Sequence, residues 1–505
     1  MKSTNVKEWL ALSVVLLIGL ALRLARLDGQ SLFIDEAWTW AATHLPWRNL
    51  LTLSLPEPIL YHLLLKLSLI ITPDSTAWLR LPSLLLSMFS LALAMLYTKF
   101  RWGFQAAFFA GILFAFSSFD IYYAQEARMY TLLACLWLTS YVFFVSALRG
   151  KAWGLAGWAI CTLLMAWAQA YGILVAAAYL GFALGCLALR KLQRQPACLD
   201  WRWLALSLAG IFLGMLPILR LISQHLPPGT STWIPGARDL HQLFLLCSIG
   251  LATARGHFPD GDHLVWAPLA AAPALAWALA ALLVYAVPAI NGLINAWKMK
   301  GDRRLEAGLA MTLVILPVAI AFTYSNLMTQ PAWALKPFLG AAYLLYLWAG
   351  IGISRFPWRG LRIAVALAAV LLSFTSLMPY YTTWERSPAA AAMRSLPALD
   401  EHDVVFAEHP YESLLVSYYL GDTYPVYGVG LNKEKNWQPI KMTPTGMLYG
   451  IYKTVQCRKL AAITDIWIYG RKERILAALP HWPRCLTAKK LWIFTDHAWQ
   501  PIHPE

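Results

Sequence analysis

Long apolar runs separated by short polar segments make up most of the chain between residues 9 and 379. A helix needs about 20 such residues to cross a bilayer at a rise of 1.5 Å per residue. The pattern predicts about eleven membrane-spanning helices, at residues 9–27, 81–98, 103–119, 129–148, 152–170, 172–189, 203–221, 264–290, 306–323, 336–353 and 361–379. We therefore predict a polytopic α-helical membrane protein.

Lysine and arginine gather in alternate loops between these runs, as at Lys99 and Arg101. Cytoplasmic loops carry this excess of positive charge, so the amino terminus is predicted to be cytoplasmic. An odd number of spans then leaves the carboxyl terminus outside. The first run ends at Arg23 and Arg26 and lacks a cleavage site of small residues, so we interpret it as a retained anchor.

Two segments of the first outer loop, residues 28–80, are apolar but unsuited to crossing the membrane. Residues 31–52 are amphipathic and rich in tryptophan, and residues 58–67 form a helical pattern that contains His62 and Lys66. Helices of this kind lie in the plane of the interface. We expect both segments to lie on the outer surface.

The composition changes near residue 384 to that of an ordinary soluble domain. Strand-like runs at 404–407, 465–469 and 491–494 alternate with helical patterns such as 412–420. This alternation is typical of a small α/β domain. The chain is thus predicted to consist of a transmembrane domain, residues 1–383, and an extracytoplasmic α/β domain, residues 384–505.

Composition agrees with the hydrophobic pattern. Hydrophobic residues make up 59% of the 505 residues and charged residues only 13%, whereas soluble domains carry about 25% charged residues. The formal charge of +15 is spread over short loops between spans, which fits cytoplasmic loops and anionic lipid rather than nucleic acid. The 25 tryptophans and 22 tyrosines are expected where aromatic rings line both membrane interfaces.

Two of the seven cysteines, Cys457 and Cys485, lie in the predicted outer domain. An oxidising compartment favours a disulfide between them, and two buried free thiols are the alternative. The sequence has no C-x-x-C spacing that would indicate a structural zinc site.

An acidic pair, Asp35 and Glu36, follows the first span directly. Carboxylates at a membrane boundary cost free energy and therefore suggest a function. One interpretation makes the pair catalytic. The alternative is that Asp35 only caps a helix that begins at Glu36.

Further polar groups are predicted on the same side of the membrane, in three outer segments. They are Glu57, Tyr61, His62, Lys66, Arg80, Asp120, Tyr123, Gln125, Glu126, Arg128, Tyr130 and Lys336. Cations at this depth suit the phosphate of a membrane lipid. The alternative for Lys66, Arg80 and Lys336 is that each side chain extends to the lipid headgroups.

A carboxylate together with phosphate-binding cations fits the transfer of a sugar from a polyprenyl phosphate. The carboxylate takes the proton of an acceptor hydroxyl while the cations hold the departing phosphate. Asp35 and Glu36 are also candidate ligands for Mg²⁺ or Mn²⁺, although no histidine or cysteine set accompanies them.

Four motifs resemble a known family in order and spacing. They are Arg26-Leu27-Asp28 with Phe33-Ile34-Asp35-Glu36-Ala37-Trp38-Thr39, then Pro58-Ile59-Leu60-Tyr61, Leu79-Arg80-Leu81-Pro82-Ser83, and Tyr123-Ala124-Gln125-Glu126-Ala127-Arg128-Met129-Tyr130. These resemble the bacterial lipid-linked glycosyltransferases of the C superfamily, relatives of protein O-mannosyltransferases and of the lipid A aminoarabinose transferase. The resemblance covers residues 20–145.

The resemblance implies a C-superfamily (GT-C) fold, Asp35 as the catalytic acid of the first loop, and a polyprenyl-phosphate sugar as donor. Two positions depart from the family pattern. Glu57-Pro58-Ile59 stands where relatives often have His-Pro-Pro, and Lys336-Pro337-Phe338 where they often have Arg-Tyr-Leu. Lysine keeps the positive charge of arginine but not its bidentate geometry.

The expected function is therefore transfer of a hexose or pentose to an acceptor hydroxyl at the outer face of a bacterial inner membrane. The residues leave open whether the acceptor is a lipid, a glycan or a protein. A transporter or flippase of lipid-linked sugars is one alternative, although transporters usually place polar groups at the bilayer midplane and have repeated halves. A structural subunit of an envelope assembly complex is another.

Overall fold

A computed structural model describes most of the chain. The described residues are 6–51, 59–192, 199–225, 240, 243, 247–248, 272–299, 301–327, 335–382, 385–399, 403–407, 412–421, 426–431, 437–441, 453–454, 465–469, 490–495 and 498–502. The chain forms two compact units. The helical unit comprises Met1–Leu27, Pro56–Tyr61 and Arg80–Trp384, and the sheet unit comprises Asp28–Leu55, His62–Leu79 and Glu385–Glu505.

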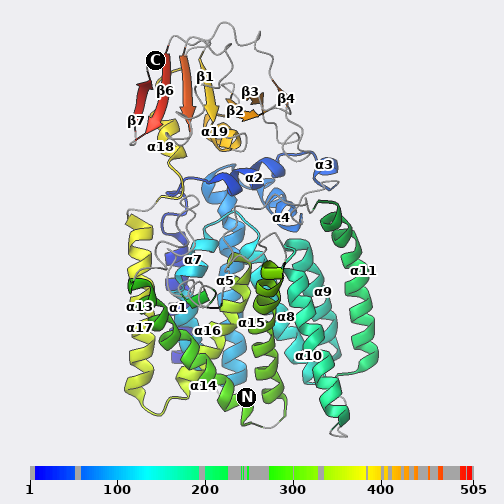
Figure 1. Cartoon of the computed structure of the whole chain (residues 1–505). Coiled ribbons are helices and arrows are strands. Elements are labelled where there is room, and N and C mark those ends of the chain that lie inside the picture. The colour runs from blue at the N-terminus through cyan, green and yellow to red at the C-terminus, as the bar shows by residue number, and fades with distance from the viewer. Residues whose placement is uncertain are drawn as a thin grey trace. The chain divides into compact units, whose positions relative to one another are not determined.

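Helices of different lengths build the helical unit (Figure 1). They are α1 Val6–Leu24, α5 Thr76–Trp102, α6 Phe104–Ala115, α7 Ser118–Ala124, α8 Tyr130–Leu148, α9 Ala152–Ala168, α10 Gly172–Leu192, α11 Trp201–His225, α13 Ala272–Ala281, η3 Leu282–Ala286, α14 Val287–Trp297, α15 Asp302–Leu327, η4 Lys336–Phe338, α16 Leu339–Ser354 and α17 Arg359–Thr382. The part of α5 that belongs to this unit begins at Arg80.

Among the described residues, eight helices are long and apolar enough to cross a membrane, or nine if the bent pair α6 and α7 counts as one span. This confirms a polytopic helical membrane protein. Helix α9 has 17 residues, and a helix of at least 18 residues is counted here as long enough to cross. Helix α1 carries three charged residues, Lys7, Glu8 and Arg23, and a helix counted as a span has at most two in its apolar stretch. The count of eleven spans therefore stays a prediction.

The predicted span 103–119 is wrong as a single helix. Helix α6 ends at Ala115, and α7 begins at Ser118 after a bend of 60°. The sequence shows no proline here, so hydrophobicity alone gave no sign of the break. Another predicted boundary is also wrong: the span expected at 264–290 continues to Trp297, through the π-helical turn η3.

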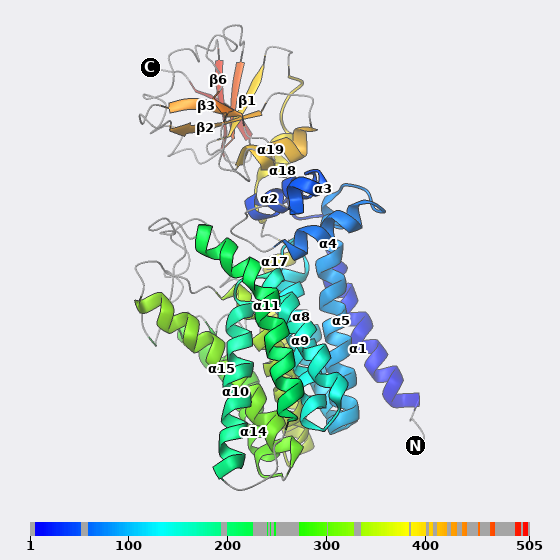
Figure 2. The ribbon, with the colours of Figure 1, turned by 90° about the vertical axis from the view of Figure 1, so that its right-hand side faces the viewer.

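Helix α16 lies at the centre of the helical unit, where its neighbours approach very closely. A Cβ atom on Gly352 would lie 1.7 Å from the carbonyl oxygen of Pro288, and one on Gly350 would lie 2.3 Å from the amide nitrogen of Ala110. Small residues allow this approach between membrane helices, where dispersion contacts replace the hydrophobic effect as the driving force. Helices α8, α9, α10 and α11 run side by side in the same unit (Figure 2).

A buried carboxylate joins α15 to α5. Glu306 is 0% exposed and accepts hydrogen bonds from Arg101 Nε at 2.8 Å, from Trp102 Nε1 at 3.0 Å and from the Tyr97 hydroxyl. Arg101 also pairs with Asp302, at 2.7 Å. Because every partner lies within the protein, the charge is compensated in the interior.

The sheet unit contains short helices and one mixed sheet of seven strands. Its helices are α2 Ile34–Thr43, α3 Trp47–Leu51, α4 Leu60–Leu69, α18 Ala389–Arg394 and α19 Glu412–Leu420. The part of α4 that belongs to this unit begins at His62. Its strands are β1 Val404–Ala407, β2 Val426–Leu431, β3 Trp437–Lys441, β4 Lys453–Thr454, β5 Asp465–Tyr469, β6 Lys490–Thr495 and β7 Ala498–Ile502.

The strands follow the order β4-β3-β2-β1-β5-β6-β7. The four central strands are parallel, and α19 connects β1 to β2 as a crossover helix. Antiparallel strands add to both sides of this core. Trp467 of β5 stacks on its register partner Trp492 of β6, with ring centroids 4.9 Å apart. The predicted strands at 404–407, 465–469 and 491–494 and the predicted helix at 412–420 are all present.

The two compact units differ from the predicted domains in one respect. They divide the chain after Trp384, where the composition changes. However, residues 28–55 and 62–79, predicted as part of the transmembrane domain, form one unit with the carboxyl-terminal residues. The acidic pair of the first loop therefore belongs to the sheet unit.

Candidate functional site

Asp35 and Glu36 lie in the first turn of α2 in the sheet unit. The helix begins at Ile34 after the N-cap residue Phe33, so Asp35 is the second helical residue. Glu36 Oε2 accepts a hydrogen bond from the Phe33 amide at 3.3 Å, the backward half of a capping box. The interpretation of Asp35 as an N-cap is therefore wrong, because the helix begins two residues earlier than assumed.

Glu36 is paired with an arginine that the sequence analysis missed. Its side chain is 0% exposed, and Oε2 lies 3.7 Å from Arg386 Nη1, whose side chain is 1% exposed. Asp35 is only half-buried. The one signal for Arg386 in the sequence is its position just after the last apolar run.

The arrangement of the acidic pair bears on the suggested metal. A metal ion would have to compete with Arg386 for the Glu36 carboxylate, which disfavours a shared Mg²⁺ or Mn²⁺ site with Asp35. Within the part of the chain that the structure describes, no group of three or more His, Cys, Asp or Glu side chains is placed to hold a metal ion. Metal binding by Asp35 and Glu36 stays a prediction.

The other end of α2 is held by Lys66 of α4. Lys66 Nζ donates to the carbonyl oxygens of Thr43 and Leu45, both at 2.7 Å, and lies 5.1 Å from the centre of the Trp47 ring. Burial lowers the pKa of Lys66. The ammonium group thus stabilises the carboxyl-terminal end of a helix, where cations are favoured. A contact with donor phosphate stays a prediction for this residue.

An exposed polar pair lies beside the same end of α2. His44 Nε2 is 3.0 Å from Asp74 Oδ2, which also accepts from Trp40 Nε1 at 3.0 Å. The hydrogen bond to Asp74 raises the pKa of His44 against the opposing effect of burial. Burial acts to raise the pKa of Asp74, but the hydrogen bonds from His44 and Trp40 bring it below its usual value.

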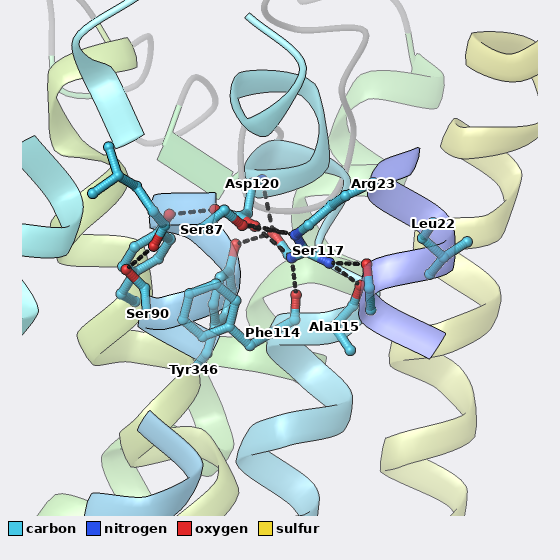
Figure 3. Close-up of polar contacts among 12 residues, drawn as sticks. Leu22, Arg23, Ser87, Ser90, Phe114, Ala115, Ser117, Asp120 and Tyr346 are labelled. Carbon is cyan, nitrogen blue, oxygen red and sulfur yellow. Dashed lines mark hydrogen bonds and ion pairs between the residues drawn. The ribbon is translucent and has the colours of Figure 1, made fainter. Parts of the chain in front are cut away.

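In the helical unit, Asp120 lies at the break between α6 and α7, in contact with Arg23 (Figure 3). Both side chains are 0% exposed. Ser87 donates to Asp120 Oδ2 at 2.6 Å, and the Tyr343 hydroxyl donates to Oδ1. Four donors from the protein therefore occupy the carboxylate, including two from Arg23. This network favours a structural role for Asp120, and donor binding stays a prediction.

Arg23 also explains how a broken helix is tolerated inside the helical unit. Its guanidinium donates to the carbonyl oxygens of Phe114 and Ala115, both at 3.1 Å, at the end of α6. Ser117 caps α7 by accepting from the Asp120 amide at 3.1 Å. Interrupted membrane helices persist only where side chains satisfy the freed backbone groups. Sequence analysis missed this role, although an arginine at the end of a span that is predicted to face outward runs against the positive-inside bias.

Gln125 holds the end of α1. Its Nε2 donates to the carbonyl oxygens of Arg23 at 2.8 Å and Ala25 at 2.7 Å, and its Oε1 accepts from the Tyr380 hydroxyl at 2.5 Å. Arg80 Nη1 donates to the Leu27 carbonyl at 2.9 Å. Side chains of the helical unit thus bind the chain just before the loop that carries Asp35.

Two predicted cations, Arg80 and Arg128, lie on adjacent segments. Ser83 lies one turn after Arg80 on α5. Its hydroxyl donates to the Arg128 carbonyl at 3.3 Å and accepts from the Tyr61 hydroxyl at 2.7 Å. Arg80 is 0% exposed and Arg128 is 4% exposed. Extension of Arg80 to the headgroups is therefore wrong, because the whole side chain is enclosed by protein.

Lys336 is more accessible than the other predicted cations of the helical unit, Arg80 and Arg128. It is half-buried at the start of η4, and its Nζ lies 5.3 Å from the centre of the Tyr130 ring. Tyr130 in turn packs edge-on against Tyr123, with centroids 5.3 Å apart. The Tyr130 ring thus lies beside the ammonium group, in a cation–π contact, and Tyr123 packs against that ring.

The remaining predicted residues are buried or outside the described part. His62 and Glu126 are 2% and 1% exposed. Glu57, Cys457 and Cys485 lie outside the described residues, so the disulfide stays a prediction. The structure brings Tyr61 close to Arg128 through Ser83, and Tyr123 and Tyr130 close to Lys336. It places Asp35, Glu36, His62 and Lys66 in the sheet unit and the other described site residues in the helical unit.

The fold of the chain is similar to that of solved structures. Its helical unit and mixed sheet match two structures of ArnT from Cupriavidus metallidurans over nearly the whole chain. The apo form has a TM-score of 0.61 at 13% identity, with 98% of each chain covered. The form bound to undecaprenyl phosphate has a TM-score of 0.59 at 13% identity, with 97% of this chain and 96% of that chain covered.

The fold expected from the sequence resemblance is therefore confirmed by its similarity to ArnT. A structure of the oligosaccharyltransferase AglB from Archaeoglobus fulgidus is also similar, with a TM-score of 0.47, 11% identity, and coverage of 82% of this chain and 63% of that chain. Comparison with protein-family models and with curated protein sequences finds no match.

Proposed function

We propose that this protein is an integral-membrane glycosyltransferase that moves a sugar from a polyprenyl-phosphate donor to an acceptor hydroxyl. The observation that carries the proposal is the match to ArnT over 98% of both chains, including a form bound to undecaprenyl phosphate. The first turn of α2 supplies a carboxylate, and the proposed reaction uses this carboxylate as its general base. The site of reaction is the outer face of a bacterial inner membrane.

Asp35 is the general base of the proposed reaction. As the acceptor oxygen forms a bond to the anomeric carbon of the sugar, its proton passes to the Asp35 carboxylate. The bond between that carbon and the phosphate oxygen breaks, and the polyprenyl phosphate departs with the bonding electrons. Glu36 does not serve as the base, because Arg386 already compensates its charge.

Lys336 is the proposed first contact of the donor phosphate. It is half-buried, whereas Arg80 and Arg128 are enclosed by protein. A cation that already contacts an aromatic ring loses little conformational freedom when it binds an anion. Arg80 and Arg128 contribute positive charge to the same unit and stabilise the departing phosphate at longer range.

Replacement of Asp35 by asparagine tests the proposal. Asparagine keeps the size and most hydrogen bonds of aspartate but accepts no proton, so transfer should slow by about 100-fold or more while donor binding stays nearly unchanged. The assay incubates purified protein with radiolabelled polyprenyl-phosphate sugars and an envelope extract, then follows the label into the acceptor. This assay also identifies the sugar and the acceptor.

A matched control variant is Asp200→Asn. Asp200 is exposed at the start of α11, where its Oδ1 accepts from the Arg202 amide at 2.9 Å, a contact that asparagine can replace. This variant should transfer at the wild-type rate. Wild-type transfer by Asp35→Asn would refute the mechanism. Movement of unmodified donor between leaflets, with no labelled acceptor, would favour the transporter.

A further inference from the structure

The segment that leads into α2 is bound by residues that follow it by more than 350 positions. Gln30 Oε1 accepts from the Arg386 amide at 3.1 Å, and Ser31 Oγ accepts from the Ala390 amide at 3.2 Å. The Leu32 amide donates to the Tyr419 hydroxyl at 2.7 Å. Three successive residues of the loop are therefore held by the chain around α18 and α19.

Arg386, whose backbone amide donates to Gln30, also makes contacts through its side chain. Its guanidinium lies 3.7 Å from Glu36 Oε2 and 6.0 Å from the centre of the Phe33 ring. Glu36 in turn binds the Phe33 amide at 3.3 Å. Arg386 thus contacts Phe33, the N-cap residue of α2, and Glu36, the third residue of the helix. Asp35 lies between these two residues in the sequence.

The same carboxyl-terminal segment is anchored in the sheet and reaches the middle of α2. Trp499 of β7 donates to the Ala392 carbonyl at 3.0 Å, and Ser387 lies 3.2 Å from the Tyr469 hydroxyl of β5. Tyr418 of α19 packs edge-on against Trp40, with centroids 5.2 Å apart. The contacts on α2 therefore extend into the core of the sheet unit.

We propose that Arg386 is a positioning residue for Asp35, and that the carboxyl-terminal sheet domain serves to hold the catalytic turn of α2 in place. The inference rests on the proposed function, since it assigns Arg386 a role in the same reaction. Arg386 acts through Glu36: it compensates the buried carboxylate and fixes the first turn, so that Asp35 meets the acceptor in one geometry. Small displacements of a catalytic group reduce the rate strongly, because reacting atoms must be aligned.

The test compares Arg386→Gln, Arg386→Lys and a control in purified full-length protein. Arg386→Gln should lower kcat about 10- to 100-fold and leave the KM for the polyprenyl-phosphate donor unchanged, because only the base is displaced. Arg386→Lys keeps the charge and should restore most of the rate. Arg394→Gln removes an exposed arginine from α18 of the same unit and should behave as wild type.

A double variant tests whether Arg386 acts through Glu36. Glu36→Gln combined with Arg386→Gln should lose no more rate than the worse single variant, because the two residues share one interaction. Hydrogen exchange gives a readout that does not depend on activity. The amides of residues 34–43 should exchange faster in Arg386→Gln than in Arg394→Gln, while those of the α8 core remain as protected as in wild type.

Several results would overturn the inference. They are an unchanged kcat and unchanged exchange in Arg386→Gln, a rise in KM without a fall in kcat, or fully additive losses in the double variant. If Asp35→Asn is inactive and Arg386→Gln is normal, the positioning role alone fails. If Asp35→Asn transfers normally, the proposed function fails, whatever the Arg386 variants do.

Discussion

Buried charges in this protein are paired with specific partners, and the pairs decide what individual residues can do. Asp120 receives two contacts from Arg23 and further hydrogen bonds from Ser87 and Tyr343. A buried pair of this kind is costly to break, since the remaining partner keeps an uncompensated charge. Lys336, by contrast, is half-buried, and its Nζ lies 5.3 Å from the centre of the Tyr130 ring.

Methionine variants should therefore separate donor-binding cations from structural ones. Lys336→Met should weaken donor binding about 10-fold or more, through loss of a charge-assisted contact, and leave the melting temperature unchanged. Arg23→Met should lower the free energy of unfolding by about 3–5 kcal/mol and leave the donor affinity of the folded protein unchanged. Arg80→Met and Arg128→Met, both buried, should lose stability as well as affinity.

The measurements are donor titration by fluorescence and thermal unfolding in one detergent. Unchanged donor affinity in Lys336→Met would leave extension to the lipid headgroups as the better account of this residue. A normal melting temperature in Arg23→Met would show that the network around Asp120 contributes little to folding.

At the scale of elements, close helix packing and local helix breaks determine the shape of the helical unit. Helix α16 passes between α6 and α14 at distances that exclude any side chain at Gly350 and Gly352. The break between α6 and α7 places Asp120 in the first turn of a new helix, next to Arg23. Both features depend on contacts between helices, and both position polar groups inside an apolar bundle.

Replacement of Gly352 by alanine should destabilise the helical unit. The added Cβ would lie 1.7 Å from the Pro288 carbonyl oxygen, so α14 and α16 must separate. Overpacking of a core costs about 1–3 kcal/mol, and here backbone has to move. Gly210→Ala on α11, where nothing lies within 4 Å of the new atom, is the matched control and should be neutral or slightly stabilising. Equal melting temperatures for the two variants would contradict this packing.

At the scale of the whole molecule, the first loop and the carboxyl-terminal domain form one compact unit. Hydrogen bonds at Gln30, Ser31 and Leu32 and the Glu36–Arg386 pair join them. Because a continuous compact unit lies on one side of a membrane, both segments should share the same compartment. The positive-inside bias predicts that this compartment is the outer one.

Cysteine alkylation of intact cells tests this topology. Single cysteines at Arg48 and Glu385, both exposed, should react with a membrane-impermeant maleimide, and one at Arg355 should react only after the cells are opened. The background lacks the seven native cysteines. Labelling of Arg48 and Glu385 from opposite sides would contradict the compact unit itself.

Much of the fold follows from local sequence patterns. Apolar runs of sufficient length become helices because an unpaired backbone is too costly in a bilayer, so the helices from α8 to α11 lie close to their predicted positions. The strands at 404–407 and 465–469 were likewise predictable, since buried parallel strands are continuous apolar runs. The sequence by itself also determined that an acidic pair stands just after the first apolar run.

Only the tertiary structure decided which charge meets which partner. Arg386 and Glu36 are 350 positions apart, and Arg23 and Asp120 are 97 apart. Hydrophobic periodicity is a local property that each segment carries alone, whereas an ion pair depends on how distant segments pack. A charged residue has many candidate partners in the sequence, and the packing of the chain selects a few of them. For this reason the sequence identified Asp35 as a candidate catalytic residue, but the structure was needed to find the arginine that pairs with the neighbouring Glu36.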